Sequence, residues 1–494
     1  MTTRSEQFSA LFDPAGVIVA GASTHPGKFG FVVLHNMITC GYRGRIFATN
    51  RDRAEVLGLQ TLSSIDEVPE GAADLLFVCT PASTNAELLT AAAAKGVRAA
   101  FIASAGYGEA DEEGRRRQEE LVELADSLGM LIVGPNGQGL VSTPSSLCAQ
   151  IVAPYPPAGR IGIASQSGNF VSSFMNLSSQ SGVGVSRAVS VGNAAQVGVL
   201  DALEYFADDP HTSVGLLYVE GITDGRGFAD RLAAVARRMP VVILKGGTTA
   251  SGARAAASHT GSLATDDKVF DGMCAQFGIV RARTLTEAFD CAATLATQPM
   301  PAGPRTAVVT TVGGWGVVTA DAIADTGLEL TPLPADLREE LDGLLPPRWS
   351  RNNPIDMAGG ETKDTVPAVL RAVAGHPGID AVIMLGVGIQ SNQGSLERNG
   401  PFYPDHGLER IVAFHDRQDR RYVETAIEVS TATGKPVLIA TELAIADPTN
   451  AAVAAMRESG RYCFPSAERA VVALDRLRAL QVWRSRRGIE SPAT

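Results

Sequence analysis

The chain has 494 residues, which exceeds what one hydrophobic core usually spans and predicts about three domains of ~150 residues each. It is 45% hydrophobic and 19% charged, and its 51 scattered glycines are typical of a globular protein rather than of a collagen-like or low-complexity chain. The formal net charge of -11 argues against a nucleic-acid-binding surface and makes any anionic ligand depend on local donors.

The six cysteines lie far apart in the sequence and form no C-x-x-C pair. This spacing favours reduced thiols over a disulfide framework or a zinc site, and so predicts a cytoplasmic location. The N-terminal segment lacks the apolar core of a signal peptide, and no run reaches the roughly 18 apolar residues of a membrane span. We therefore expect no membrane partner.

Short β-branched runs alternate with longer amphipathic segments along the chain, which is the pattern of parallel strands joined by helical crossovers. The pattern restarts after a proline-rich linker at 152–160 and again after 298–305. The sequence therefore predicts an α/β fold of three consecutive doubly wound parallel-sheet domains. The predicted domains span residues 1–150, 158–298 and 304–485. A polar segment at 392–419 interrupts the third domain and is too long for a routine loop, so we expect a lid there.

In open parallel sheets, ligands bind outside the carboxyl ends of the strands, so the residues after each strand are the candidates. In the first domain the turn AGASTHPGKFG follows a strand and opens a helix, which makes its backbone N–H groups suitable for a phosphate. Its glycine spacing is not G-x-G-x-x-G, and the second strand ends in Asn50-Arg51 rather than in the acidic residue that binds the ribose of NAD.

A nucleotide other than NAD is therefore expected in the first domain. Arg51 and Arg53 are suited to an additional phosphate, such as the ribose 3'-phosphate of coenzyme A, unless they are ordinary surface arginines. The candidate cofactor-binding residues are Gly21, Ser23, Lys28, Asn50, Arg51, Pro81 and Asn136.

The second domain opens with IASQSGNF, in which Ser165, Ser167 and Gly168 stand between a strand and a helix. Their donors converge on a positive helix end and favour a phosphate, although a serine that only caps the helix is the alternative. The pattern is not G-x-S-x-G, which argues against a hydrolase nucleophile.

A histidine lies in a small-residue loop of the same domain, in the motif SHTGSL. Lys245 and a Gly-Gly turn precede His259, and Gly261 and Ser262 open the next helix. An unshielded imidazole at this position is suited to attack phosphorus. Glu220 follows the strand VGLLYV, where a carboxylate would hold the imidazole tautomer and stabilise its charged form. A surface histidine and an exposed glutamate are the alternatives.

Together, the motifs SHTGSLA, SQSG, VSVGN and GPN resemble the alpha subunit of succinyl-CoA ligase, and the whole chain is similar to ADP-forming acetate–CoA ligases. The resemblance implies a Rossmann-like CoA-binding domain followed by two flavodoxin-like ligase domains. It implies that His259 is phosphorylated and that acyl phosphate passes between acid, CoA and histidine. Glu220 is the implied carboxylate partner, with Asp201 and Glu204 as the next candidates.

The resemblance adds Asn193 and, in the third domain's TTVGGWG loop, Gly313 and Gly314 to the phosphate-binding residues. The chain departs from the family pattern at Gly137, where relatives often carry cysteine, and at Trp315, since relatives often have GGPG in place of GGWG. These departures leave the acyl substrate open.

The implied chemistry needs ATP or ADP with Mg2+, but no segment has the pattern of an ATP-grasp domain and no G-x-x-x-x-G-K-[ST] occurs. We therefore expect an ATP-grasp beta-type subunit as the partner in a hetero-oligomer. Coenzyme A and a small carboxylic acid are the expected ligands, and no metal site is expected in this chain. The alternatives are a CoA-dependent acyl or carbamoyl transferase that uses no nucleotide, and a catalytically idle CoA-binding regulatory protein.

Overall fold

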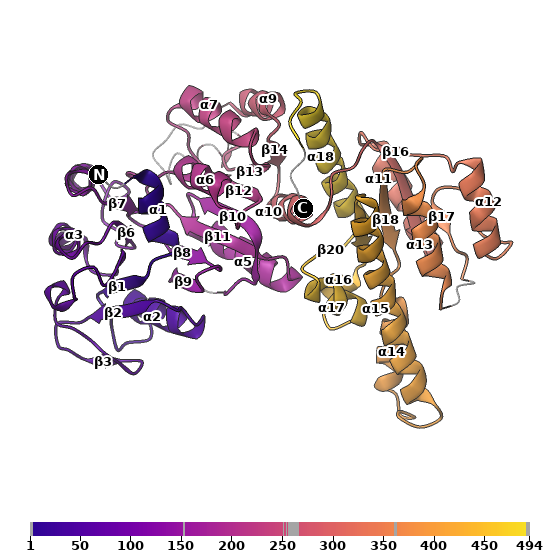
Figure 1. Cartoon of the computed structure of the whole chain (residues 1–494), viewed down its shortest axis with the longest axis horizontal. Helices are drawn as coiled ribbons and strands as arrows, with labels where there is room; N and C mark the ends of the chain where they lie inside the picture. The colour runs from indigo at the N-terminus through magenta and orange to yellow at the C-terminus, as the bar shows by residue number, and fades with distance from the viewer. Residues whose placement is uncertain are drawn as a thin grey trace. The chain divides into compact units, whose positions relative to one another are not determined.

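The computed structural model describes residues 3–151, 154–249, 251–252, 254, 266–359 and 363–490 (Figure 1). The chain divides into two compact units. The first comprises Met1–Gln180 and Gly184–Leu285, and the second comprises Ser181–Val183 and Thr286–Thr494. Among the helices in the described ranges, none is long and apolar enough to cross a membrane.

The first sheet is parallel and has the strand order β2-β1-β5-β6-β7. Four of its strands are buried along their whole length, as their continuous apolar runs predict. The strands are β1 (Gly16–Ala20), β2 (Arg45–Thr49), β5 (Leu75–Val78), β6 (Ala99–Ile102) and β7 (Leu131–Val133). Its helices are α1 (Arg4–Phe12), α2 (Phe29–Thr39), α3 (Asn85–Ala94) and α4 (Glu112–Ser127). The order reverses between β1 and β5, which is where such a sheet binds ligands.

The second sheet has the order β14-β13-β12-β10-β11-β8-β9. The parallel strands are β10 (Ala158–Ser165), β11 (Val185–Ser190), β12 (Val214–Val219), β13 (Val241–Lys245) and β14 (Val280–Ala282). Its order reverses at β10, between β11 and β12. The helices are α5 (Gly168–Ser181), α6 (Val199–Asp208), α7 (Gly225–Ala236) and α9 (Asp267–Phe277).

An antiparallel hairpin extends this second sheet, although its residues precede the proline-rich linker. It consists of β8 (Gly139–Ser142) and β9 (Leu147–Gln150), and β8 pairs with β11 in an antiparallel ladder from Arg187–Ser142 to Val189–Leu140. The residues predicted to end the first domain therefore complete the sheet of the second.

The third sheet lies in the second unit and has the order β16-β15-β18-β19-β20, with β17 paired to β15. Its strands are β15 (Arg305–Thr310), β16 (Glu329–Leu330), β17 (Ile355–Asp356), β18 (Ala381–Leu385), β19 (Val437–Ala440) and β20 (Cys463–Phe464). The helices of this unit are α10 (Leu285–Thr297), α11 (Gly313–Ala324), α12 (Ala335–Leu344), α13 (Thr365–Gly375), α14 (Ile389–Arg398), α15 (Leu408–Thr433), α16 (Leu443–Ala446), α17 (Ala451–Glu458) and α18 (Ala467–Ser485). Asp290 of α10 accepts a bidentate ion pair from Arg469 of α18, with contacts of 2.6 and 2.7 Å.

The polar segment at 392–419 is largely helical rather than an irregular insertion. It comprises most of α14 and the first half of α15, and these two helices pack side by side (Figure 1). A Cβ on Gly394 of α14 would make an ordinary van der Waals contact with Val412 of α15, at 3.5 Å. Its polarity reflects the solvent-facing sides of two helices, and its role as a lid stays a prediction.

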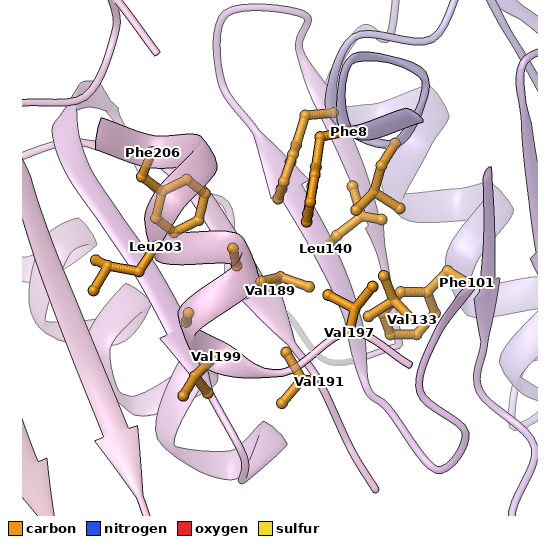
Figure 2. Close-up of a cluster of buried hydrophobic side chains, with 14 of the residues drawn as sticks. Phe8, Phe101, Val133, Leu140, Val189, Val191, Val197, Val199, Leu203 and Phe206 are labelled. Carbon is orange, nitrogen blue, oxygen red and sulfur yellow. The ribbon is translucent and has the colours of Figure 1, made fainter. Parts of the chain in front are cut away.

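A continuous hydrophobic core joins the first two sheets within the first unit. Figure 2 shows Phe8 of α1, Phe101 of β6 and Leu140 of the hairpin in one cluster with Val189 of β11 and Phe206 of α6. All five side chains are at most 3% exposed. The hairpin is thus held by packing on both of its neighbours as well as by the ladder to β11.

Next to this core lies one buried arginine, Arg187, whose side chain is 2% exposed. Its guanidinium donates to Asp209 at 3.0 Å, to Asp13 at 2.7 and 2.8 Å, and to the Ser142 hydroxyl. Burial opposes ionisation of Asp209, but the hydrogen bond and charge of Arg187 prevail and lower the pKa of this carboxyl. The cluster ties α1, β8 and the end of α6 to β11.

Candidate functional site

The turn after β1 packs directly against the start of α2. Gly21 has a φ of +88°, and a Cβ there would lie 2.8 Å from Cγ2 of Thr80 in the turn after β5. A Cβ on Gly30 would overlap the carbonyl oxygen of Gly21. The glycines therefore bring the turns after β1 and β5 together below the first turn of α2. Lys28 is the N-cap of this helix and makes no capping hydrogen bond through its side chain.

Asn50 contacts the turn after β1. Its Nδ2 donates to the Ala22 carbonyl at 2.8 Å, and its Oδ1 accepts from Asp52 N at 2.9 Å, so it ties the turn after β2 to the turn after β1. The Ser23 hydroxyl accepts from His25 N at 3.1 Å within the same turn.

The basic and proline candidates of this domain lie nearby on the surface. Arg51 is exposed, whereas Arg53 forms an ion pair with Glu67 at 2.7 Å. Pro81 is exposed at the start of the short turn after β5. The structure therefore brings the predicted cofactor-binding residues of β1, β2 and β5 to one edge, and of the two arginines only Arg53 is held by an acid.

Asn136 lies after β7 with a φ of +61° and faces the second domain. Its Nδ2 lies 3.4 Å from Oδ1 of Asn193, which follows β11. Asn193 in turn donates to Glu109 at 2.5 Å and to Gln118 at 2.9 Å. A cofactor-binding candidate and a phosphate-binding candidate thus meet at the contact between the first two sheets, and a phosphate contact by Asn193 stays a prediction.

The neighbouring Gly137 is enclosed. A Cβ at this position would lie 2.5 Å from Cζ of Phe101 and 2.9 Å from the Ser190 carbonyl oxygen. The fully buried Phe101 ring therefore leaves little room for a side chain at this position.

The second sheet presents the SQSG turn where its strand order reverses. Ser165 is fully buried, and its hydroxyl accepts from Ser167 N at 3.1 Å and donates to the Ser167 carbonyl at 2.6 Å. This local pairing tightens the turn so that α5 begins at Gly168. A Cβ on Gly168 would overlap the side chain of Gln138, which would have to move to make room for it.

Glu220 follows β12, the strand that pairs with β10 where the order of the second sheet reverses. The side-chain amide of Gln166 holds its backbone: Oε1 accepts from Glu220 N at 2.5 Å and from Gly221 N at 3.2 Å, and Nε2 donates to the Gly221 carbonyl at 3.1 Å. Burial and the neighbouring Glu220 carboxylate together raise the pKa of the Tyr218 phenol. The SQSG turn and Glu220 therefore form one connected site.

The two alternative carboxylates are engaged elsewhere. Asp201 accepts from Gly198 N at 2.7 Å at the start of α6, and Arg231 of α7 contacts Asp201 at 2.9 Å and Glu204 at 2.7 Å. Their structural contacts favour Glu220 as the acid of the site.

His259, Gly261 and Ser262 lie outside the described residues. The chain on either side of this segment is described: Lys245 ends β13, and Asp267 opens α9. Lys245 is 4% exposed, its Nζ lies 3.6 Å from Oδ1 of Asp267, and it also lies over the Phe270 ring. The flanks of the histidine segment thus meet at the carboxyl end of β13, which pairs with β12.

The third sheet repeats the turn of the second. The Thr310 hydroxyl at the end of β15 accepts from Val312 N at 2.9 Å and donates to the Val312 carbonyl at 2.8 Å, and α11 begins at Gly313. A Cβ on Gly313 would overlap the Asp356 carboxylate, whereas a Cβ on Gly314 would meet no described atom within 4 Å. Half-buried Trp315 lies in the first turn of α11.

Metal ligands do not gather at these sites. In the part of the chain that the structure describes, no group of three or more His, Cys, Asp or Glu side chains is placed to hold a metal ion.

Comparison with protein families defines the class. Residues 16–142 match the CoA binding domain, residues 158–295 match the succinyl-CoA ligase like flavodoxin domain, and residues 306–388 match the ligase-CoA domain. A CoA-binding domain followed by two ligase domains is the composition of an acid–thiol ligase.

The particular family follows from whole-chain similarity. The chain is 33% identical over 484 residues to the alpha subunit of acetate–CoA ligase [ADP-forming] I from Pyrococcus furiosus, which covers 97% of this chain and 98% of that one. It therefore belongs to the family of ADP-forming acetate–CoA ligase alpha subunits. The predicted family is confirmed.

Two further relatives bear on fold and substrate. The dinucleotide-forming acetyl-coenzyme A synthetase 1 of Ca. Korarchaeum cryptofilum, solved with phosphate and ADP, superposes with a TM-score of 0.83 at 30% identity, covering 98% of this chain and 99% of that one. This match confirms the predicted fold class. The 4-hydroxybutyrate–CoA ligase [ADP-forming] of Nitrosopumilus maritimus is 29% identical over 381 residues, which cover 76% of this chain and 54% of that relative.

Proposed function

We propose that this chain is the alpha-type subunit of an acid–CoA ligase that carries phosphate on His259. The enzyme interconverts acyl-CoA, NDP and phosphate with a carboxylic acid, CoA and NTP. The observation that supports the proposal most directly is the connected site of the SQSG turn and Glu220, next to the flanks of the SHTG segment.

The turns after β1, β2 and β5 of the first sheet are suited to coenzyme A. The overlap that a Cβ on Gly30 would produce shows that backbone and helix end approach closely there, which suits a phosphate group at the N-terminus of α2. Gly21, Ser23, Lys28, Asn50 and Arg51 surround this helix end and are proposed to bind the cofactor, with Pro81 and Asn136 at the rim. Coenzyme A supplies the thiol that the acyl group is transferred to and from.

The phosphoryl steps use the chain's own nucleophile. A ring nitrogen of His259 attacks the phosphorus of the acyl phosphate, the phosphorus–oxygen bond to the acyl group breaks, and the carboxylic acid leaves as a carboxylate. Glu220 orients the imidazole and stabilises its positive charge. Ser165, Ser167, Gly168, Gly261 and Ser262 are proposed to bind the phosphate. Gly313, Gly314 and Asn193 are proposed to join them.

A separate subunit is proposed to complete the reaction. The match to an alpha subunit of almost equal length supports an ATP-grasp beta-type partner in a hetero-oligomer, which binds ATP or ADP with Mg2+ and exchanges phosphate with His259. We also propose a cytoplasmic location, because six free cysteines suit a reducing compartment. The substrate is proposed to be a small carboxylic acid, since the relatives are named for acetate and for 4-hydroxybutyrate.

Phosphate labelling tests the proposal. The purified chain is incubated with labelled inorganic phosphate and a panel of acyl-CoA esters, and intact mass and peptide mapping locate the label. We expect an acid-labile, base-stable phosphoryl group on His259 that His259→Ala removes and the surface control His211→Ala retains. The proposal would be refuted if His259→Ala took up as much label as the parent, or if the parent took up no label with any ester.

Nucleotide dependence separates the ligase from a transferase or an idle regulator. With a beta-type partner and Mg2+, acyl-CoA formation from acid and CoA should require ATP or GTP. Equal formation without nucleotide would favour the transferase, and CoA binding without turnover or labelling would favour the regulator.

A further inference from the structure

We propose that Gln166, the residue between the two serines of SQSG, is a positioning residue that sets the direction of the Glu220 carboxylate. This inference rests on the proposed function, because it assigns a device that serves the phosphohistidine step. Sequence reasoning selected the serines on either side of Gln166 and gave the glutamine no role.

The side chain of Gln166 continues the sheet beyond the last strand residues. β10 and β12 pair in parallel register up to Ser165 and Tyr218, and the Gln166 backbone N–H still donates to the Tyr218 carbonyl at 3.2 Å. Past that point the two strands part, and the backbone groups of Glu220 and Gly221 lose their neighbour. The amide of Gln166 then supplies one acceptor for two N–H groups and one donor for a carbonyl.

The N–H groups of Glu220 and Gly221 lie on the two peptide planes that flank the Glu220 Cα, so their hydrogen bonds restrain the direction in which its side chain leaves the backbone. The bond to the Gly221 carbonyl restrains the next peptide plane. A primary amide suits the task because it carries both an acceptor and a donor. A glutamate at 166 would lack the donor and add a negative charge beside Glu220, and an aliphatic residue would leave three backbone groups without this partner.

Gly246, which follows β13, also lies close to Glu220. Its N–H donates to the Val219 carbonyl at 2.8 Å, and a Cβ there would lie 2.8 Å from the Tyr218 hydroxyl and 3.5 Å from Cγ of Glu220. The Gln166 amide therefore fixes the backbone of Glu220, and the Glu220 side chain lies close to the backbone that leads into the histidine segment. The site needs this precision, because a misplacement of about 1 Å commonly costs on the order of a hundredfold in rate.

A double-mutant cycle tests the inference. Gln166→Met keeps an unbranched side chain of similar length but removes the amide, and Glu220→Gln removes the charge. The rate of phosphohistidine formation from acyl-CoA and phosphate is measured for the parent, both single variants and the double variant. We expect Gln166→Met to slow labelling by roughly ten- to a hundredfold with CoA affinity unchanged. In the Glu220→Gln background the same change should alter the rate by less than about twofold, because it acts through the missing carboxylate.

Gln196→Met is the matched control. Gln196 is also half-buried, and its amide accepts from Ile132 N at 2.7 Å and donates to Asp126 at 2.6 Å, away from the SQSG turn. We expect it to lower the unfolding midpoint about as much as Gln166→Met but to leave the labelling rate near the parental value. Gln166→Asn, which keeps the amide one methylene short, should fall between parent and Gln166→Met and serves if the methionine variant folds poorly.

The outcomes separate this inference from the proposed function. A parent that labels His259 together with a Gln166→Met variant that labels at the parental rate would overturn the positioning role alone. Slowing by the same factor with and without the Glu220 charge would also overturn it, since the amide would then act independently of that carboxylate. A parent that forms no phosphohistidine would overturn both.

Discussion

Replacing Arg187 by methionine should destabilise the first unit by about 3–5 kcal/mol, the usual result of breaking a buried ion pair from one side. Methionine matches the stem of arginine but leaves the carboxylates of Asp209 and Asp13 without their cation. The two acids should not contribute equally. Asp209 is 2% exposed in its side chain, whereas Asp13 is 35% exposed and can regain water. Most of the loss should therefore come from Asp209.

Urea unfolding, followed by circular dichroism and by hydrogen–deuterium exchange of peptides from the first unit, measures the change, because the three tryptophans of the chain all lie in the second unit. Adding Asp209→Asn to Arg187→Met should recover a large part of the lost free energy, because a neutral amide costs less to bury than an unpaired charge. Adding Asp13→Asn should recover no more than about 1 kcal/mol, the scale of partly exposed charges. An Arg187→Met loss below about 1 kcal/mol, or equal recovery by the two asparagines, would refute the reasoning.

The effect should also depend on pH. In the parent, Arg187 keeps the pKa of Asp209 below its unfolded value, so this stabilisation is present above the unfolded pKa and is lost as pH falls through the folded one. In Arg187→Met the unpaired carboxyl should have a raised pKa, so acid should neutralise it while the chain is still folded. The difference in unfolding free energy between parent and variant should therefore shrink from pH 7 towards pH 4.

Three further changes test the strand-end turns. Gly30→Ala should destabilise the first unit by about 1–3 kcal/mol through overpacking. In calorimetry of the whole chain, the parent should bind CoA and not NADH, and the variant should bind CoA more weakly. A variant that binds CoA as tightly as the parent would contradict the CoA site proposed at the start of α2. Gly137→Cys should also destabilise the first unit by ~1–3 kcal/mol, and adding Phe101→Val should restore part of the lost stability by making room for the new side chain. A Gly137→Cys variant as stable as the parent would show that the enclosed position already has room. Ser165→Ala should lower the free energy of unfolding by about 1–3 kcal/mol and slow the labelling of His259. Thr310→Ala removes the equivalent hydroxyl from the turn after β15 in the second unit and is the comparison variant. Unchanged labelling in Ser165→Ala would show that the SQSG turn is not part of the phosphate site.

Strand ends were the most predictable part of the molecule. Continuous apolar runs bounded by glycine and polar residues mark the buried parallel strands, so the SQSG turn after β10 and Glu220 after β12 could be placed at one edge before the sheet order was known. The contact between them could not, because it depends on β10 and β12 being neighbours in the sheet. Gln166 was missed for this reason: its three partners lie 54 and 55 positions away in sequence.

The arrangement of two elements could not be predicted from local composition. The segment at 392–419 is polar because α14 and α15 expose much of their surface, and composition alone does not separate a solvated helix pair from an irregular insertion. The hairpin β8–β9 was placed with the first domain because it precedes the proline-rich linker. Its partner, β11, begins 35 residues beyond the end of β9, and a pairing of that kind leaves no mark in a local pattern.

That hairpin has a consequence for the order in which the chain is made. All five strands of the first sheet emerge from a ribosome before Gly139, so that sheet is complete in sequence when the hairpin appears. The hairpin must then wait for Val185–Ser190 to be synthesised before β8 finds its ladder. A lone two-stranded hairpin is marginal in water and leaves both edges open. A nascent chain from which the hairpin has emerged but Val185–Ser190 have not therefore exposes a strand edge next to a finished sheet. The linker that separates two domains in sequence does not separate two steps in folding.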